Sequence, residues 1–81
     1  MPTALRKDGF RVIVYFDDHL PSHVHVISAD SEVKISLGSE TVQPEIIEYR
    51  GRRCTAVKAL ELVISHQPDL LQAWRDIHGE S

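Results

Sequence analysis

The sequence predicts an α+β fold, with a small antiparallel sheet of three to four strands followed by one or two C-terminal helices. Alternating and β-branched residues, which are typical of strands, fill the chain from about residue 10 to residue 49. Apolar residues then recur with the period of a helix from about residue 55 to residue 78. Strands that all precede the helices are typical of the α+β class. Because the chain has 81 residues and no internal repeat, we expect residues 1–81 to form a single domain.

Three segments predict the first strands. The run "FRVIVYF" at 10–16 is β-branched and aromatic on both faces, which indicates a central strand. The segments "HVHVIS" at 23–28 and "EVKISL" at 32–37 alternate, so their apolar side chains share one face and their polar side chains the other. The linker "ADS" at 29–31 is short and turn-like, and it predicts an antiparallel hairpin between these two strands.

The rest of the chain predicts one more strand and two helices. We interpret 38–44 as a loop, "EIIEY" at 45–49 as a fourth strand, and "RGRR" at 50–53 as a turn. A first helix is expected after Thr55 as its N-cap, and Pro68 can stand in the first turn of a second helix that stops at Gly79. The apolar positions that define these helices are Val57, Leu60, Val63 and Ile64 in the first, and Leu70, Leu71, Trp74 and Ile77 in the second.

Composition restricts the classes of function. Asp and Glu number 12 against 9 Lys and Arg, so the net charge of −3 with neutral His does not favour nucleic acid overall. The single cysteine, Cys54, excludes an intramolecular disulfide and fits a reducing, cytoplasmic setting. No apolar run approaches the roughly 20 residues that span a bilayer, so we expect no membrane association. A small core and a free sheet edge favour a homodimer or a complex with another protein.

The stretch "FDDHLPSHVHV" at 16–26 is the strongest candidate site. His23 and His25 are two apart on a predicted strand, so they lie on the same face, while Val24 and Val26 point to the core. We expect the face that carries the histidines to be exposed to solvent, partly exposed, or set in a groove. His19 lies in the preceding loop, and Asp17 and Asp18 are near enough in sequence to orient an imidazole.

Three interpretations of this cluster stay open on spacing alone. In the first, His19, His23 and His25 bind a divalent metal such as zinc. In the second, the histidines perform metal-free acid–base chemistry, because histidine titrates near neutrality. On RNA they would remove the 2′-OH proton and protonate the leaving 5′ oxygen. In the third, the residues only satisfy backbone groups in a turn and fill a polar strand face.

Two other features carry weaker signals. "RGRR" is the best source of phosphate contacts in the chain, through Arg50, Arg52 and Arg53, although such runs are more often solvated turns. We interpret Cys54 as a small residue near the start of the expected first helix, and a nucleophile at this helix N-terminus is the minor hypothesis.

The stretches "DGFRVIVYFDDHLPSHVHV" and "EVKISL" resemble a small bacterial family of unknown function, family forty-one-sixty, whose signature contains a His-x-Pro-Pro-His-x-His stretch. His19, Pro21, His23 and His25 fall on that signature, while Ser22 stands where a second proline is usual. The resemblance implies a protein encoded beside a second small protein, in pairs that look like toxin–antitoxin modules. It implies no particular reaction. The segment 38–53 is less similar to the family, so the resemblance implies no role for "RGRR".

We therefore predict the toxin component of a bacterial two-gene module, acting as a metal-independent endoribonuclease. The predicted catalytic residues are His19, His23, His25 and Asp18, with phosphate contacts from Arg50, Arg52 and Arg53. The expected partners are RNA and the small antitoxin-like protein encoded by the adjacent gene, and no cofactor is required. The alternative is a non-enzymatic module that binds a divalent metal or another protein and regulates that partner.

Overall fold

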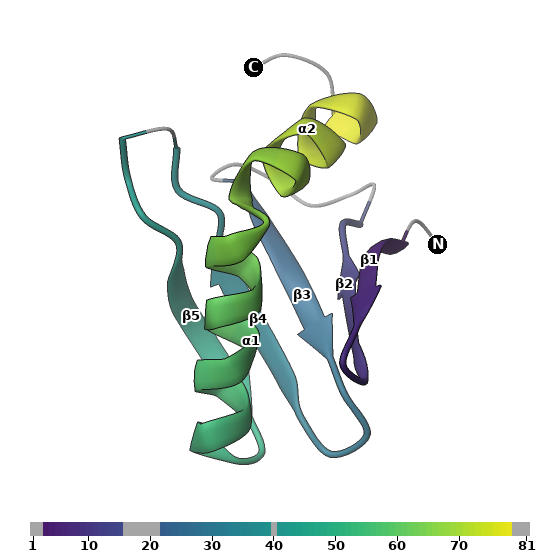
Figure 1. The fold of residues 1–81 in the computed structure, drawn as a ribbon, viewed down its shortest axis with the longest axis vertical. Helices are drawn as coiled ribbons and strands as arrows, with labels where there is room; N and C mark the ends of the chain where they lie inside the picture. Colours follow the sequence, from purple (N-terminus) through teal and green to yellow (C-terminus); the bar gives the residue numbers. More distant parts are fainter. Residues whose placement is uncertain (1–2, 16–21, 40, 79–81) are drawn as a thin grey trace.

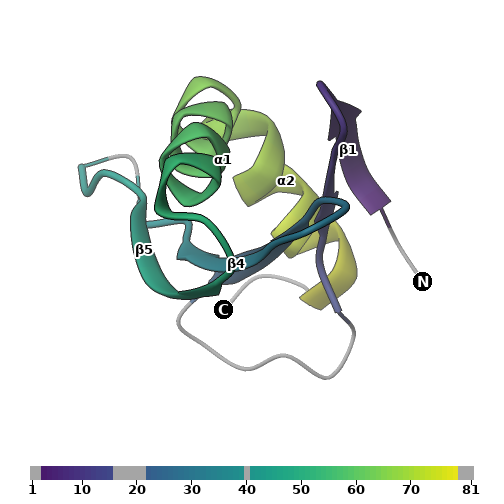
Figure 2. The same cartoon turned by 90° about the horizontal axis from the view of Figure 1, so that it is seen from below.

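The computed structural model describes residues 3–15, 22–39 and 41–78 and has the predicted α+β fold (Figure 1). Five strands of these residues form one antiparallel sheet whose order follows the sequence. The strands are β1 (Thr3–Lys7), β2 (Phe10–Ile13), β3 (His23–Ile27), β4 (Glu32–Ser36) and β5 (Glu45–Arg50). Two helices follow, α1 (Arg53–Ser65) and α2 (Gln67–His78); α1 packs on one face of the sheet, and α2 continues from it toward the end of the sheet (Figure 2). Neither of these helices has the length and apolar character needed to cross a membrane.

The sheet of the described residues has five strands rather than the expected three to four, because "TALRK" forms a strand that the sequence pattern did not reveal. β1 pairs antiparallel with β2 through a two-residue turn in which Asp8 and Gly9 have φ values of 54° and 82°. Two successive positive φ values fit the tight hairpin turn that Asp-Gly favours. β1 lies at the edge of the sheet, where little of a strand is buried, so its apolar pattern is weak.

The central strands match their predictions. β2 lies between β1 and β3, as expected of a central strand, although it ends at Ile13 rather than at residue 16. β3 and β4 form the predicted antiparallel hairpin, in which Val24 pairs with Ile35 and Val26 with Val33. The face that these apolar pairs share is covered by the helices and forms the core. The buried core residues are Phe10, Val12, Val14, Val24, Val26, Val33, Ile35, Leu37, Ala56, Ala59, Leu62, Val63, Leu70 and Trp74.

α1 differs from its prediction in its start and in its buried face. It begins at Arg53 with Arg52 at the N-cap position and no side-chain cap, so the predicted N-cap Thr55 lies inside the helix. The buried positions are Ala56, Ala59, Leu62 and Val63, whereas Leu60 and Ile64 are only partly buried and Val57 is 45 % exposed. Only Val63 of the predicted stripe is buried. Two small alanines on the buried face allow the helix backbone to approach the sheet closely, and apolar size alone did not identify them.

α2 begins one residue before Pro68, which occupies the first turn as predicted. The side-chain amide of Gln67 donates to the carbonyl oxygens of Leu37, Ser39 and Val42 at 2.7, 2.8 and 3.0 Å. These bonds tie the start of α2 to the segment between β4 and β5. α2 then runs across the end of the sheet at which β3 begins (Figure 1). The predicted stop at Gly79 lies outside the described residues.

Candidate functional site

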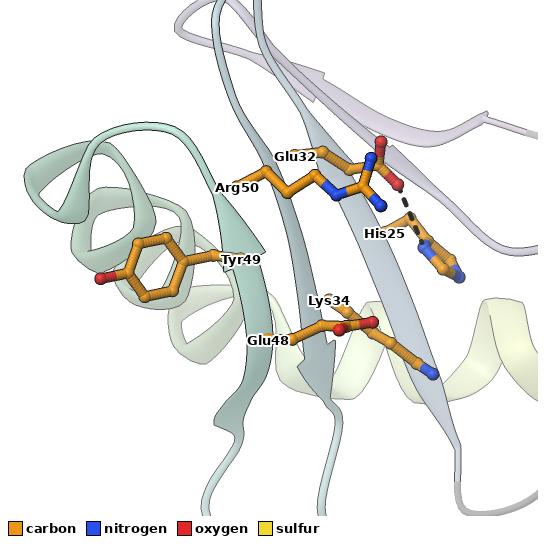
Figure 3. Close-up of a pocket in the computed structure, with 6 residues that line it drawn as sticks. All are labelled: His25, Glu32, Lys34, Glu48, Tyr49 and Arg50. Carbon is orange, nitrogen blue, oxygen red and sulfur yellow. Dashed lines mark ion pairs between the residues drawn. The ribbon is translucent and has the colours of Figure 1, made fainter.

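The sheet face opposite the helices, here called the polar face, carries a row of ionisable side chains. His25 pairs with Lys34 across the β3–β4 ladder, and Lys34 pairs with Glu48 across the β4–β5 ladder. One step along the same face, Glu32 pairs with Arg50. Because paired residues in adjacent strands point to the same face, these five side chains project from one surface. Figure 3 shows them rising from the three strands.

These side chains surround a shallow hollow of about 120 Å³. Its lining residues are His25, Glu32, Lys34, Glu48, Tyr49 and Arg50, and Tyr49 extends away from the others (Figure 3). Two carboxylates, one ammonium and one guanidinium meet here, so the hollow offers both cations for an anionic group and acceptors that hold an imidazole in place. It is open to solvent rather than enclosed.

His25 is the histidine that faces this hollow. Its side chain is 17 % exposed, and its Nδ1 lies 4.0 Å from Oε2 of Glu32, which is 55 % exposed. The His25 ring also contacts the Tyr15 ring edge-on, with ring centroids 4.8 Å apart. In the β2–β3 ladder, His25 is paired with the buried Ile13. At 4.0 Å the carboxylate is an ion-pair neighbour of Nδ1, beyond hydrogen-bond distance, and Nε2 on the other side of the ring is buried. His25 is therefore a mostly buried imidazole whose Nδ1 lies on the side of a carboxylate.

His23 lies on the same face of the sheet as His25, as predicted, but its side chain is buried rather than exposed to solvent. It is 7 % exposed, and its ring centroid lies 5.3 Å from that of His25 and 5.6 Å from that of Trp74. Trp74 in turn stacks on His78 with centroids 4.0 Å apart. The α2 helix, which crosses the start of β3, brings these rings together. A strand pattern specifies which face a residue occupies, but it does not show that a helix distant in sequence will cover that face.

The turn "RGRR" is divided by the structure. Arg50 lines the hollow, whereas Arg52 is 77 % exposed and lies 4.0 Å from Asp30 through its Nε. The backbone N–H of Arg52 also donates to the Ser31 hydroxyl at 3.4 Å. Arg53 is exposed at the first position of α1. Arg52 and Arg53 do not line the hollow, so of the three predicted phosphate contacts only Arg50 lines it together with His25.

The other predicted site residues are outside this group. His19 and Asp18, together with Asp17, lie outside the described residues. Cys54 is exposed in the first turn of α1 and does not line the hollow. Within 3–15, 22–39 and 41–78, no cluster of three or more His, Cys, Asp or Glu side chains is arranged to hold a metal ion. The predicted metal set included His19, so these residues do not test it.

Sequence reasoning missed Glu32, Glu48 and Lys34 as neighbours of His25. Lys34 was placed on the outward face of its strand, which is where it lies. Its pairing with His25 depends on the register of the β3–β4 hairpin, and that of Glu48 depends also on a bulge in β5 between Ile46 and Glu48. Neither register can be read from alternation alone. Trp74 was predicted as an apolar position of the second helix, and its contact with His23 was not anticipated.

Comparison with protein families shows that residues 9–75 match the family described as Domain of unknown function (DUF4160). The match includes β2 through most of α2 and leaves out β1. No curated protein matched the chain, and no solved structure matched it. The matched family carries no description of an activity, so the chemistry of the polar face has to be assessed from its own geometry.

Proposed function

The chain belongs to the family described as Domain of unknown function (DUF4160), and we propose that this member is the toxin component of a bacterial two-gene module and cleaves RNA without a metal ion. The observation that carries the proposal is the imidazole of His25, whose Nδ1 lies 4.0 Å from Oε2 of Glu32, in a hollow that Lys34 and Arg50 also line. The partner that we propose is a small antitoxin-like protein encoded by the adjacent gene.

The proposed reaction is transfer within one RNA strand followed by release. His25 accepts the proton of a ribose 2′-OH, and the 2′ oxygen attacks the adjacent phosphorus. The bond from phosphorus to the 5′ oxygen breaks, and the leaving oxygen takes a proton from a general acid. The products are a 2′,3′-cyclic phosphate and a free 5′-OH. Lys34 and Arg50 stabilise the additional negative charge on the phosphate in the transition state.

The burial of His23 decides how we assign the other two histidines of the predicted cluster. His23 is enclosed by His25 and Trp74, so we assign it to holding the His25 ring rather than to contacting RNA. His19 and Asp18 fall on the family signature and lie outside the described residues. His19 was predicted as an auxiliary to His23 and His25, and we now assign it the role of general acid because His23 is buried. Arg50 is retained as a phosphate contact, and Lys34 replaces Arg52 and Arg53 in that role.

The test is cleavage of a labelled RNA oligonucleotide by the purified chain in the presence of EDTA. We expect products that end in a cyclic phosphate, and no cleavage where the ribose at the scissile position is 2′-deoxy. His25→Ala should lower the rate at least about 100-fold, the usual contribution of a positioned general base. Lys34→Ala should lower the rate, while Lys58→Ala, which removes an exposed lysine on α1, should not.

Each variant needs a thermal unfolding profile so that loss of activity is separated from loss of the fold. Cleavage of the 2′-deoxy substrate, or a His25→Ala variant that is as active as the wild type, would refute the proposed mechanism. In cells, growth arrest on expression that persists in His25→Ala would refute the toxin assignment through this site.

A second function, divalent metal binding, is favoured by the proximity of His23 and His25, whose ring centroids are 5.3 Å apart. Two imidazoles at this separation could both contact one ion after small rotations, with His19 as the predicted third ligand. Calorimetric titration with zinc distinguishes the two functions. Stoichiometric binding that is lost in His23→Ala, with RNA cleavage absent, would favour the metal module.

A further inference from the structure

β5 forms one edge of the sheet and has little protection from solvent. It is the last strand in the order β1-β2-β3-β4-β5, and only Ile46 of its six residues is partly buried. An edge strand presents backbone donors and acceptors that can pair with another strand. Natural edges are usually protected by charges or by a bulge. β5 has a bulge, but the extra residue that it accommodates is the apolar Ile47 rather than a charged one.

The exposed apolar side chains of the described residues gather around this edge. The four large hydrophobic residues that stay exposed are Val42, Ile47, Tyr49 and Val57, at 57, 47, 43 and 45 %. Val42 lies in the segment before β5, Ile47 and Tyr49 lie on β5, and Val57 lies on α1, which packs against β4 and β5. No such residue lies on the described part of the opposite edge, around β1. An apolar concentration at one unpaired edge is typical of an interaction surface.

The charges of β5 favour a second copy of the same strand. When "EIIEYR" is placed antiparallel to itself about a two-fold axis, Glu45 faces Arg50 of the partner subunit twice, and Ile46 faces Tyr49 of the partner subunit twice. The faces of these four residues agree in this register, and the central pair places Ile47, the bulge residue, opposite Glu48 of the partner subunit. Glu45 and Arg50 both lie on the polar face, because they pair with Ser36 and Glu32, and Ile46 and Tyr49 both lie on the helix-covered face, because they pair with Ile35 and Val33.

Neighbouring registers are unfavourable. A shift of one residue in either direction places polar-face residues opposite helix-face residues, which the pleat of a continuous sheet does not allow. A shift of two residues one way places Glu45 opposite Glu48 of the partner subunit, and like charges directly opposite one another destabilise a strand pair. The same shift the other way places Glu48, on the polar face, opposite Tyr49 of the partner subunit, on the helix-covered face.

We propose that two copies of the chain associate through antiparallel pairing of their β5 strands, with Glu45 opposite Arg50 of the partner subunit, to form one continuous sheet of ten strands. Val42, Ile47, Tyr49 and Val57 line the seam. The two-fold axis is perpendicular to the sheet, so both polar faces look in the same direction. His25 is two strands from the seam, so the two His25 strands lie about 24 Å apart, five strand spacings of about 4.8 Å.

Charge reversal tests the register directly, with molar mass from light scattering after size-exclusion chromatography as the measurement. We expect the wild-type chain to pass from monomer to dimer over about a hundredfold range of protein concentration. Glu45→Arg and Arg50→Glu each replace two attractive pairs by two repulsive ones, and each should weaken the dimer at least about tenfold. Glu61→Arg, a matched reversal on the exposed side of α1, should leave the dimer unchanged.

Mixing the two weakened variants is the decisive arm. In a mixed dimer of Glu45→Arg with Arg50→Glu, both cross-strand pairs are again attractive, so the mixture should dimerise as well as the wild type does. The doubly reversed chain, Glu45→Arg with Arg50→Glu in one molecule, should also dimerise. A wild-type chain that stays monomeric, or a dimer that neither single reversal weakens or that mixing does not restore, would overturn the proposal. The measurement needs no RNA, so its outcome is independent of the proposed activity.

Discussion

At the scale of single residues, Gly51 shows how one backbone position connects the sheet to the first helix. Its φ is 106°, in the region that favours glycine, and a Cβ at this position would meet the Ser31 hydroxyl and lie 2.6 Å from the Asp30 carbonyl oxygen. Ser31 is buried in the turn between β3 and β4 and accepts the N–H of Arg52. The turn after β5 thus packs on the turn after β3, which holds Arg50 beside the hollow.

Gly51→Ala should therefore destabilise the protein by about 1–3 kcal/mol, because it adds both backbone strain and a steric overlap. Gly9→Ala is the matched control, since Gly9 has a φ of 82° but no atom within 4 Å of the added Cβ. Gly9→Ala should lower the free energy of unfolding only by the backbone strain, about 1 kcal/mol. Urea denaturation of the two variants measures the difference. Equal losses would show that the contact with Ser31 is relaxed without cost.

At the scale of elements, α1 determines how closely the helix layer approaches the sheet. Ala56 and Ala59 are fully buried, and they lie on the same face as Leu62 and Val63. Small residues at these positions leave room for the large side chains of β4, such as Val33 and Ile35. The exposed Val57 contributes nothing to this contact, although it was predicted to lie on the apolar stripe of the helix.

Ala59→Leu should destabilise the monomer by about 1–3 kcal/mol, because additional methylene groups overfill a packed interface. Val57→Ala should change the monomer by less than about 0.5 kcal/mol, as for a surface position. Both are measured by denaturant unfolding at a protein concentration low enough for the monomer to predominate. A larger loss for Val57→Ala than for Ala59→Leu would mean that the helix packs with the opposite face.

At the scale of the whole molecule, the sheet is a meander in which every strand pairs with its neighbours in sequence. β3 is the middle strand and is bonded on both sides, whereas β1 and β5 each have one neighbour. Backbone bonds that are shielded on both sides open only with much of the structure, while those at edges open locally.

Amide hydrogen exchange should therefore be slowest in β3 and fastest in β1 among the five strands of the described chain. In β5, exchange should slow as the protein concentration rises, because a second copy would cover its outer donors. Exchange by nuclear magnetic resonance at two concentrations measures both effects. Equal protection of β1 and β3 would contradict the first expectation, and a β5 that is insensitive to concentration would contradict the second.

The sequence by itself determined the class of the fold, most of the element order and the faces of the strands. Val24 and Val26 point to the core, and His23 and His25 point away from it, because side chains alternate at every step of a strand. This is a local property, so it can be read from one segment. The α+β class is also readable, because strand and helix periods differ.

Only the tertiary structure decided which residues surround the histidines. His25 shares a hollow with Glu32, Lys34 and Arg50 through strand register, and His23 is buried because a helix some fifty residues away carries Trp74 across the start of β3. β1 and the buried alanines of α1 also had to be seen in the fold. Register and burial arise from contacts between segments distant in sequence, and no local periodicity encodes those contacts.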